Sequence, residues 1–222
     1  MRKSLRARAT PAATTTAPVA GLGATTAAGT GNSPAHRSHH DSHGRTGIRR
    51  RIPVTAERSR LSSPDVRSRS RIPGTARADG FGCTGGNQPI RPRRKTAPKT
   101  ARGYAVSMQD PDASTGSSFR HRMARDIPAN TTGPGRTPPA GATSRTNDGR
   151  RARYAGPRPP AGDITHRHRI TVYALDTPSL NLPATSTPAV AAFTLSSHII
   201  GYGRITATAT TATATATATA QR

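Results

Sequence analysis

The most closely spaced metal-binding side chains in this sequence are four histidines between residues 36 and 43. They stand at positions i, i+3, i+4 and i+7, which a helix would align on one face, where imidazoles can bind Zn²⁺, Ni²⁺ or Cu²⁺ (His36, His39, His40 and His43). Residues typical of a helix start and end frame a ten-residue helix over 34–43 (Ser33, Pro34 and Gly44). A helix of this length is marginal in water, so we predict a transient helix in a solvated linker and no metal site.

A glycine pattern at residues 80–85 could bind a dinucleotide. The segment reads GFGCTG and matches G-x-G-x-x-G, in which glycines let the backbone approach a pyrophosphate. The pattern works only between a strand and a helix, and here TARAD precedes it and GNQP follows it. We therefore interpret it as a glycine-rich loop and predict no cofactor.

Residues for catalysis are present but scattered. The ten acidic residues stand mostly apart, and Cys83 is the sole cysteine, so neither a disulfide nor a cysteine-based metal site can form within the chain. Catalytic pairs need burial and a rigid scaffold to tune their pKa values. We predict no catalytic residue and no enzyme.

Two basic patches are the strongest candidates for binding. They are Arg49–Arg51 and the segment 90–102, which reads IRPRRKTAPKTAR and is followed by Tyr104. Extended arginines can contact phosphates without a fold, and a tyrosine can stack on a base. We predict salt-sensitive binding to DNA or RNA without sequence preference, through Arg49, Arg50, Arg51, Arg91, Arg93, Arg94, Lys95, Lys99 and Arg102.

The elements that must position these residues are poorly supported by the composition. Arginine outnumbers lysine 31 to 3 and the net charge is +24. Leu, Ile, Val and Phe supply 26 of 222 residues, about 12%, where less than about 20% in a highly charged chain indicates disorder. The 36 alanines add little area to bury. The composition predicts a predominantly intrinsically disordered chain with no stable globular fold.

Three regions differ in character along the chain. Residues 1–169 are basic and rich in Arg, Pro, Gly and Ser; residues 170–205 are weakly apolar; residues 206–222 form a Thr/Ala low-complexity tail. Ile170–Leu175 and Ala189–Ile205 are strand-like, and we expect the 189–205 segment to pair between molecules and aggregate. The Thr210-Thr211 doublet breaks the Thr/Ala alternation, which argues against a selected strand in the tail.

No specific biochemical function follows from these features. The leading interpretation is a disordered, monomeric polycation that binds nucleic acid or other polyanions, with no membrane span and no defined protein partner. One alternative is the product of an unselected GC-rich reading frame without evolved function. Another is an organelle-targeted or secreted interaction protein, because the segment 1–16 is Arg-rich, hydroxyl-rich and free of acidic residues. The compartment stays open.

Overall fold

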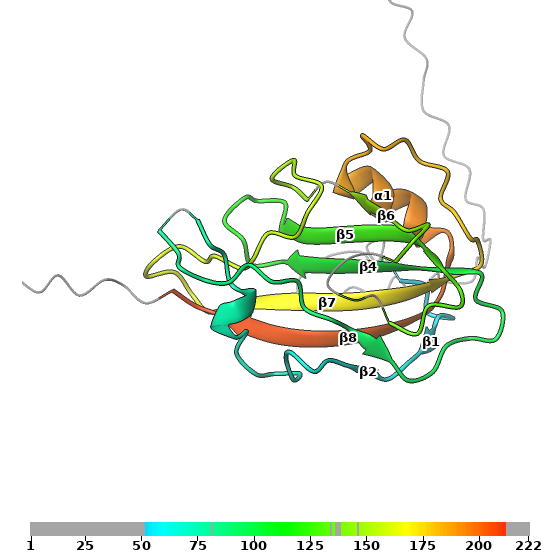
Figure 1. Ribbon diagram of the computed structural model, residues 1–222, viewed down its shortest axis with the longest axis horizontal. Helices are drawn as coiled ribbons and strands as arrows, with labels where there is room; N and C mark the ends of the chain where they lie inside the picture. The colour runs from blue at the N-terminus through cyan, green and yellow to red at the C-terminus, as the bar shows by residue number, and fades with distance from the viewer. Residues whose placement is uncertain (1–51, 81, 134, 136–138, 146, 212–222) are drawn as a thin grey trace, which may run out of the picture. The chain divides into compact units, whose positions relative to one another are not determined.

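A six-stranded mixed β-sheet forms the centre of the described part of the chain (Figure 1). This computed structural model describes residues 52–80, 82–133, 135, 139–145 and 147–211. The spatial order of the strands is β1-β8-β7-β4-β5-β6, and every neighbouring pair is antiparallel except β1 and β8, which are parallel. The strands are β1 (Glu57–Arg58), β4 (Gly103–Asp110), β5 (Phe119–Pro128), β6 (Thr143–Arg145), β7 (His166–Leu175) and β8 (Ile199–Ala209).

Smaller elements accompany this sheet. β2 (Leu61–Ser62) and β3 (Arg93–Arg94) form a separate antiparallel pair, and η1 (Gly74–Ala76) is one turn of 3-10 helix. The helix α1 (Pro188–Ser196) begins at Thr187, whose side chain accepts a hydrogen bond from Val190 N. Proline suits the first helical position that it occupies here. No helix among the described residues is long and apolar enough to cross a membrane.

The two faces of the sheet pack against different clusters of residues, because side chains alternate between the faces along each strand. On one face, Val106 and Val172 join a core with the partly buried Leu61. On the other, Ala105 and Leu175 pack with Leu195 of α1. A third cluster covers the end of the sheet near η1; it contains Val66, Ile72, Ala76, Ile90, Met108, Tyr154, Ile170, Ile205, Ala207 and Ala209.

The prediction of a disordered chain without a stable fold is wrong over residues 62–210, where the chain forms a defined globular domain. The composition argument counted only large apolar residues. Eight of the 24 buried apolar residues in the described chain are alanines, and Ala105, Ala124 and Ala207 are fully buried. Buried arginine and histidine side chains fill further space, Arg125 and His168 among them. Closely packed strands can therefore form a core with fewer large apolar side chains than an average domain contains.

The strand-like segments are partly confirmed. Ile170–Leu175 lies inside β7, so the boundary that we placed at residue 170 falls within a strand. The prediction of a strand over Ala189–Ile205 is wrong in its first half, which forms α1, and right from Ile199 onward. Thr206–Ala209 continues β8, contrary to the expectation that no strand extends into the Thr/Ala tail. The aggregation tendency of 189–205 stays a prediction.

Candidate functional site

Four buried ionisable side chains meet at one end of the sheet. Asp110 ends β4, His121 lies near the start of β5, and His166 and His168 begin β7. Because β5 and β7 both run antiparallel to β4, their first residues lie beside its last. The exposed fractions are 3% for Asp110, 5% for His121, 1% for His166 and 0% for His168. Residues 110, 121, 166 and 168 thus form one cluster despite their separation in sequence.

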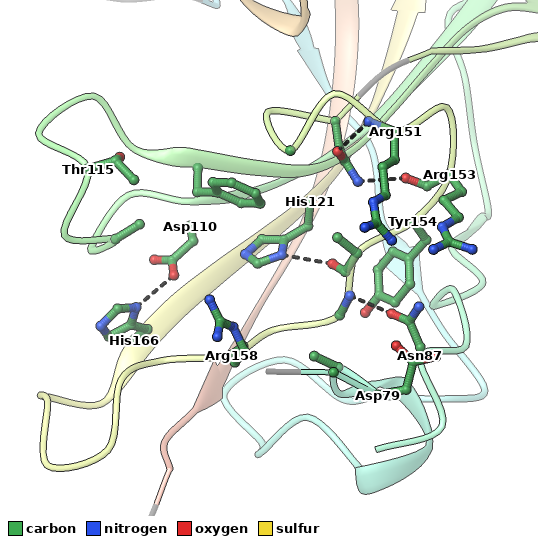
Figure 2. A pocket seen from close by; sticks show the side chains of 18 of the residues that line it. Asp79, Asn87, Asp110, Thr115, His121, Arg151, Arg153, Tyr154, Arg158 and His166 are labelled. Carbon is green, nitrogen blue, oxygen red and sulfur yellow. Dashed lines mark hydrogen bonds and ion pairs between the residues drawn. The ribbon is translucent and has the colours of Figure 1, made fainter. Parts of the chain in front are cut away.

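His166 is held between two carboxylates. Its Nδ1 lies 2.7 Å from Asp110 Oδ2, and its Nε2 lies 3.2 Å from Asp163 Oδ2 (Figure 2 shows the first contact). Burial alone would lower the pKa of His166, but the hydrogen bonds to Asp110 and Asp163 outweigh burial and raise it. The imidazolium form is therefore favoured at this position.

His121 and His168 differ from His166 because their pKa values are lowered. His121 Nδ1 lies 2.8 Å from the carbonyl oxygen of Ala155, which can only accept, so Nδ1 carries the proton and Nε2 has a free lone pair. Burial lowers the pKa of His121 to about 4. Burial and the neighbouring histidines lower the pKa of His168 to about 3. Both rings are neutral at neutral pH, and their centroids lie 5.1 Å apart.

The loop between β4 and β5 is fixed by a second carboxylate. Asp112 Oδ1 lies 2.6 Å from Arg167 Nη2, and Asp112 Oδ2 accepts hydrogen bonds from the backbone and Nε of Arg167. The hydrogen bond from Arg167 is the main reason why the pKa of Asp112 falls to about 2. The Asp112 backbone N–H in turn donates to Asp110 Oδ1 at 2.9 Å. This chain of contacts orients the Asp110 carboxylate.

A cavity of about 500 Å³ opens above Asp110, His121 and His166. Its walls come from the 78–87 loop, the β4–β5 loop and the segment 147–160, which approach one another in Figure 2. Gly156 is required where two of these walls meet, because a Cβ at this position would lie 2.4 Å from the backbone nitrogen of Ala78. The Gly156 N–H donates to Asn87 Oδ1 at 2.7 Å and joins the two loops.

Three arginines line the same cavity. Arg151, Arg153 and Arg158 are all exposed, and Figure 2 shows the Arg158 side chain directed toward Asp110 and His121. The acidic residues of the lining are Asp79 and Asp110. With His166 favoured as the cation, positive side chains outnumber negative ones around the cavity.

The basic residues predicted to bind nucleic acid lie elsewhere or outside the described residues. Arg49, Arg50 and Arg51 fall in the part of the chain that the structure does not describe. None of the other six lines the cavity (Arg91, Arg93, Arg94, Lys95, Lys99 and Arg102). Arg91 makes an ion pair with Asp65 at 2.6 Å.

Tyr104, which we had expected to stack on a base, is covered by one of these arginines. The guanidinium carbon of Arg94 lies 3.7 Å from the centre of the Tyr104 ring, and Tyr104 is 4% exposed. A guanidinium over an aromatic face is a stabilising contact within the fold. Arg94 and Tyr104 are therefore part of the packing around β3 and β4.

Sequence reasoning missed Asp110, His121, His166 and His168. The available signal was the alternation of His166 and His168, which enters the strand-like run from residue 170 in phase with it. The two histidines occupy alternate positions of a strand, whereas the four at 36–43 have the spacing of a helix face. Those four lie outside the described residues. In the GFGCTG segment, Gly80 lines the cavity and Gly82 has a φ of 82°.

Comparison with known proteins identifies relatives over this region. The family profile described as "PBP: Phosphatidylethanolamine-binding protein" matches residues 62–210. UPF0098 protein YbhB of Escherichia coli is 30% identical over 155 residues, which cover 67% of this chain and 98% of YbhB. Putative lipoprotein LppC of Mycobacterium tuberculosis is 36% identical over 127 residues, or 56% of this chain and 61% of LppC.

Solved structures agree with these matches. The crystal structure of E. coli YbcL, described as a new member of the mammalian PEBP family, superposes with a TM-score of 0.66 at 29% identity. The superposition covers 68% of this chain and 98% of the YbcL chain. A putative PEBP homologue from Chlamydia trachomatis has a TM-score of 0.59 at 20% identity.

These findings overturn the functional prediction. A disordered polycation that binds nucleic acid non-specifically is not what this sequence encodes, because residues 62–210 form the structured domain of a known family. The excess of arginine is distributed over a folded surface, and part of it is used in ion pairs such as Arg91–Asp65 and Arg167–Asp112.

Proposed function

The chain belongs to the phosphatidylethanolamine-binding protein family, and we propose that its cavity binds a small phosphorylated ligand of the phospholipid head-group class. The observation that carries the proposal is the set of three arginines around one cavity (Arg151, Arg153 and Arg158). Guanidinium groups make short, charge-assisted hydrogen bonds to phosphate oxygens.

The size and floor of the cavity support the same ligand class. A volume of about 500 Å³ lies within the range of roughly 300–1,000 Å³ typical of small-molecule sites. His166 lies at the floor with its pKa raised, so it adds positive charge near a bound anion while its two N–H groups donate to Asp110 and Asp163. Asp79 lines the wall and is exposed, which leaves a carboxylate for the ammonium group of a zwitterionic head group.

We propose binding without turnover. His121, the neutral imidazole that faces the cavity, has its proton fixed on Nδ1 by the Ala155 carbonyl. None of the hydrogen bonds among the described residues places a serine, threonine or cysteine against His121 or His166 as a nucleophile. The family name supports a carrier or sensor of a head group.

Isothermal titration calorimetry with phosphoethanolamine tests the proposal, with ethanolamine as the ligand that lacks the phosphate. We expect one site for phosphoethanolamine and none for ethanolamine. Arg151→Gln should weaken binding by about tenfold, the lower end of what one charge-assisted hydrogen bond contributes.

Arg102→Gln provides the matched control, because Arg102 is exposed and lies outside the cavity lining. It should leave the affinity unchanged. Equal losses in Arg151→Gln and Arg102→Gln would mean that phosphate binds to the general positive charge of the chain, and the proposal would then be wrong.

A further inference from the structure

Three buried imidazole nitrogens close to the Asp110 carboxylate lack a well-formed hydrogen bond in the described structure. They are Nε2 of His121 and both ring nitrogens of His168. Such groups are rare, since a buried polar atom left without a partner costs about 1–3 kcal/mol. The two rings come from β5 and β7, the strands on either side of β4, and stand next to the buried Asp110 carboxylate.

We propose that Asp110, His121 and His168 form a three-ligand site for a divalent transition-metal ion, with Zn²⁺ as the occupant. One ligand atom from each residue lies within 4.8 Å of the other two. His168 Nε2 and Asp110 Oδ2 are 3.4 Å apart, which is close to the separation of about 3.3 Å between ligands bound at 2.0–2.1 Å in a tetrahedron.

The surroundings of two ligands are those of a metal site. A metal-bound histidine usually donates its other ring N–H to a carbonyl or carboxylate, which fixes its tautomer and orientation. His121 does so to Ala155 O, and this leaves Nε2 as the ligating atom. The Asp110 carboxylate is oriented from outside by His166 Nδ1 and by the Asp112 N–H.

The ligand set selects the class of metal. Two neutral imidazoles and one carboxylate suit Zn²⁺ and its neighbours among the transition metals, whereas Mg²⁺ and Ca²⁺ prefer oxygen ligands. Asp110 and His121 also line the cavity, so a bound ion would keep one coordination position directed toward it. In zinc sites that are not purely structural, three protein ligands commonly leave the fourth position to water or to another ligand.

This inference does not rest on the phosphorylated ligand, and its test uses no phosphate compound. The full chain also contains the four histidines between 36 and 43, so the measurements use a background in which these four are replaced by glutamine. Zn²⁺ is titrated into this background against a competing chromogenic chelator at neutral pH. We expect one Zn²⁺ ion per chain.

Three substitutions in this background test which residues bind the Zn²⁺ ion. His168→Phe keeps an aromatic ring beside His121, and Asp110→Asn keeps the shape of the carboxylate; each should weaken Zn²⁺ binding by at least about tenfold, the loss caused by removing even an indirect support of a metal ligand. His198→Gln is the control, because the His198 side chain is 37% exposed and pairs with Asp176 after the far end of β7. It should bind Zn²⁺ as the background does.

A spectroscopic readout covers the case in which a substituted chain does not fold. In the unsubstituted protein, Zn²⁺ should shift the side-chain nitrogen resonances of His121 and His168 and leave those of His198 unchanged. Co²⁺ in place of Zn²⁺ should give the visible absorption of a low-coordinate site with nitrogen ligands. Zn²⁺ binding of equal strength in the background and in His168→Phe, or unshifted His121 and His168 resonances at saturating Zn²⁺, would overturn the proposal.

Discussion

The ion pair between Arg125 and Asp126 gives the sharpest test of how this arginine-rich chain is stabilised. The Arg125 side chain is 1% exposed. Its guanidinium contacts the Asp126 carboxylate and donates to the carbonyl oxygens of Leu182 and Pro183, so it fastens the segment before α1 to β5. Asp126→Asn removes the negative charge and one of the two acceptor oxygens that Arg125 and the Leu180 N–H use, and asparagine tolerates the left-handed φ of 55° found here.

The expected cost follows from the burial of the remaining charge. Removing one partner of a buried ion pair typically destabilises a protein by about 3–5 kcal/mol, because the other charge is left without compensation. Asp112→Asn provides the comparison, because the charge that it leaves behind, on the Arg167 side chain, is 60% exposed. A charge that stays hydrated needs little compensation, so Asp112→Asn should cost less than Asp126→Asn.

Urea unfolding of the two variants at neutral pH measures both free energies of unfolding. We expect Asp126→Asn to lose more of its free energy of unfolding than Asp112→Asn. A double variant, Arg125→Met with Asp126→Asn, should recover part of the loss, because no charge then stays buried. A loss of less than about 1 kcal/mol in Asp126→Asn, or equal losses in both single variants, would contradict the reasoning.

Three further predictions concern the core and the cavity wall. Burial raises the pKa of Tyr154, so the folded state resists ionisation of this side chain. The free energy of unfolding should therefore fall as pH rises above the ordinary tyrosine pKa of 10.0. Urea unfolding should show a smaller fall in Tyr154→Phe. Gly156→Ala should separate the two loops that it joins and abolish phosphoethanolamine binding in calorimetry, since its Cβ would overlap backbone atoms. Leu195→Ala should cost about 2–5 kcal/mol in thermal or urea unfolding, whereas Phe193→Ala, at a side chain that is 81% exposed, should change stability by less than about 0.5 kcal/mol.

Part of the fold could be predicted from local sequence. The strand over Ile170–Leu175 was predictable because β-branched and aromatic residues gather there without a proline. The helix α1 was missed although its start is readable: Thr187 caps it and Pro188 occupies the first helical position. We interpreted the segment after Pro188, Ala189–Ile205, as strand-like throughout, whereas proline also begins helices.

The candidate site could not be predicted from local patterns. Asp110 and His121 approach because β4 and β5 form an antiparallel pair, and His168 joins them only because β7 pairs with β4 on the other side. β4 and β5 are consecutive strands joined by the loop 111–118, whereas β4 and β7 are far apart in the sequence and pair only through tertiary contacts. Without the register, a histidine at 121 and another at 168 are isolated residues.

The Thr/Ala tract shows why its low complexity was misleading. In the register of β7 with β8, His168 lies opposite Ala207 and His166 lies opposite Ala209. Directly opposed residues in an antiparallel pair have their Cβ atoms about 4.5–5.5 Å apart, so a large residue at either position would compete with the imidazole for space. Ala207 is 0% exposed and Ala209 is 3% exposed, while the intervening Thr208 lies on the other face. The Thr/Ala alternation therefore places alanines, whose side chains are small, next to the two histidine rings. The positions of both rings depend on having alanine at residues 207 and 209.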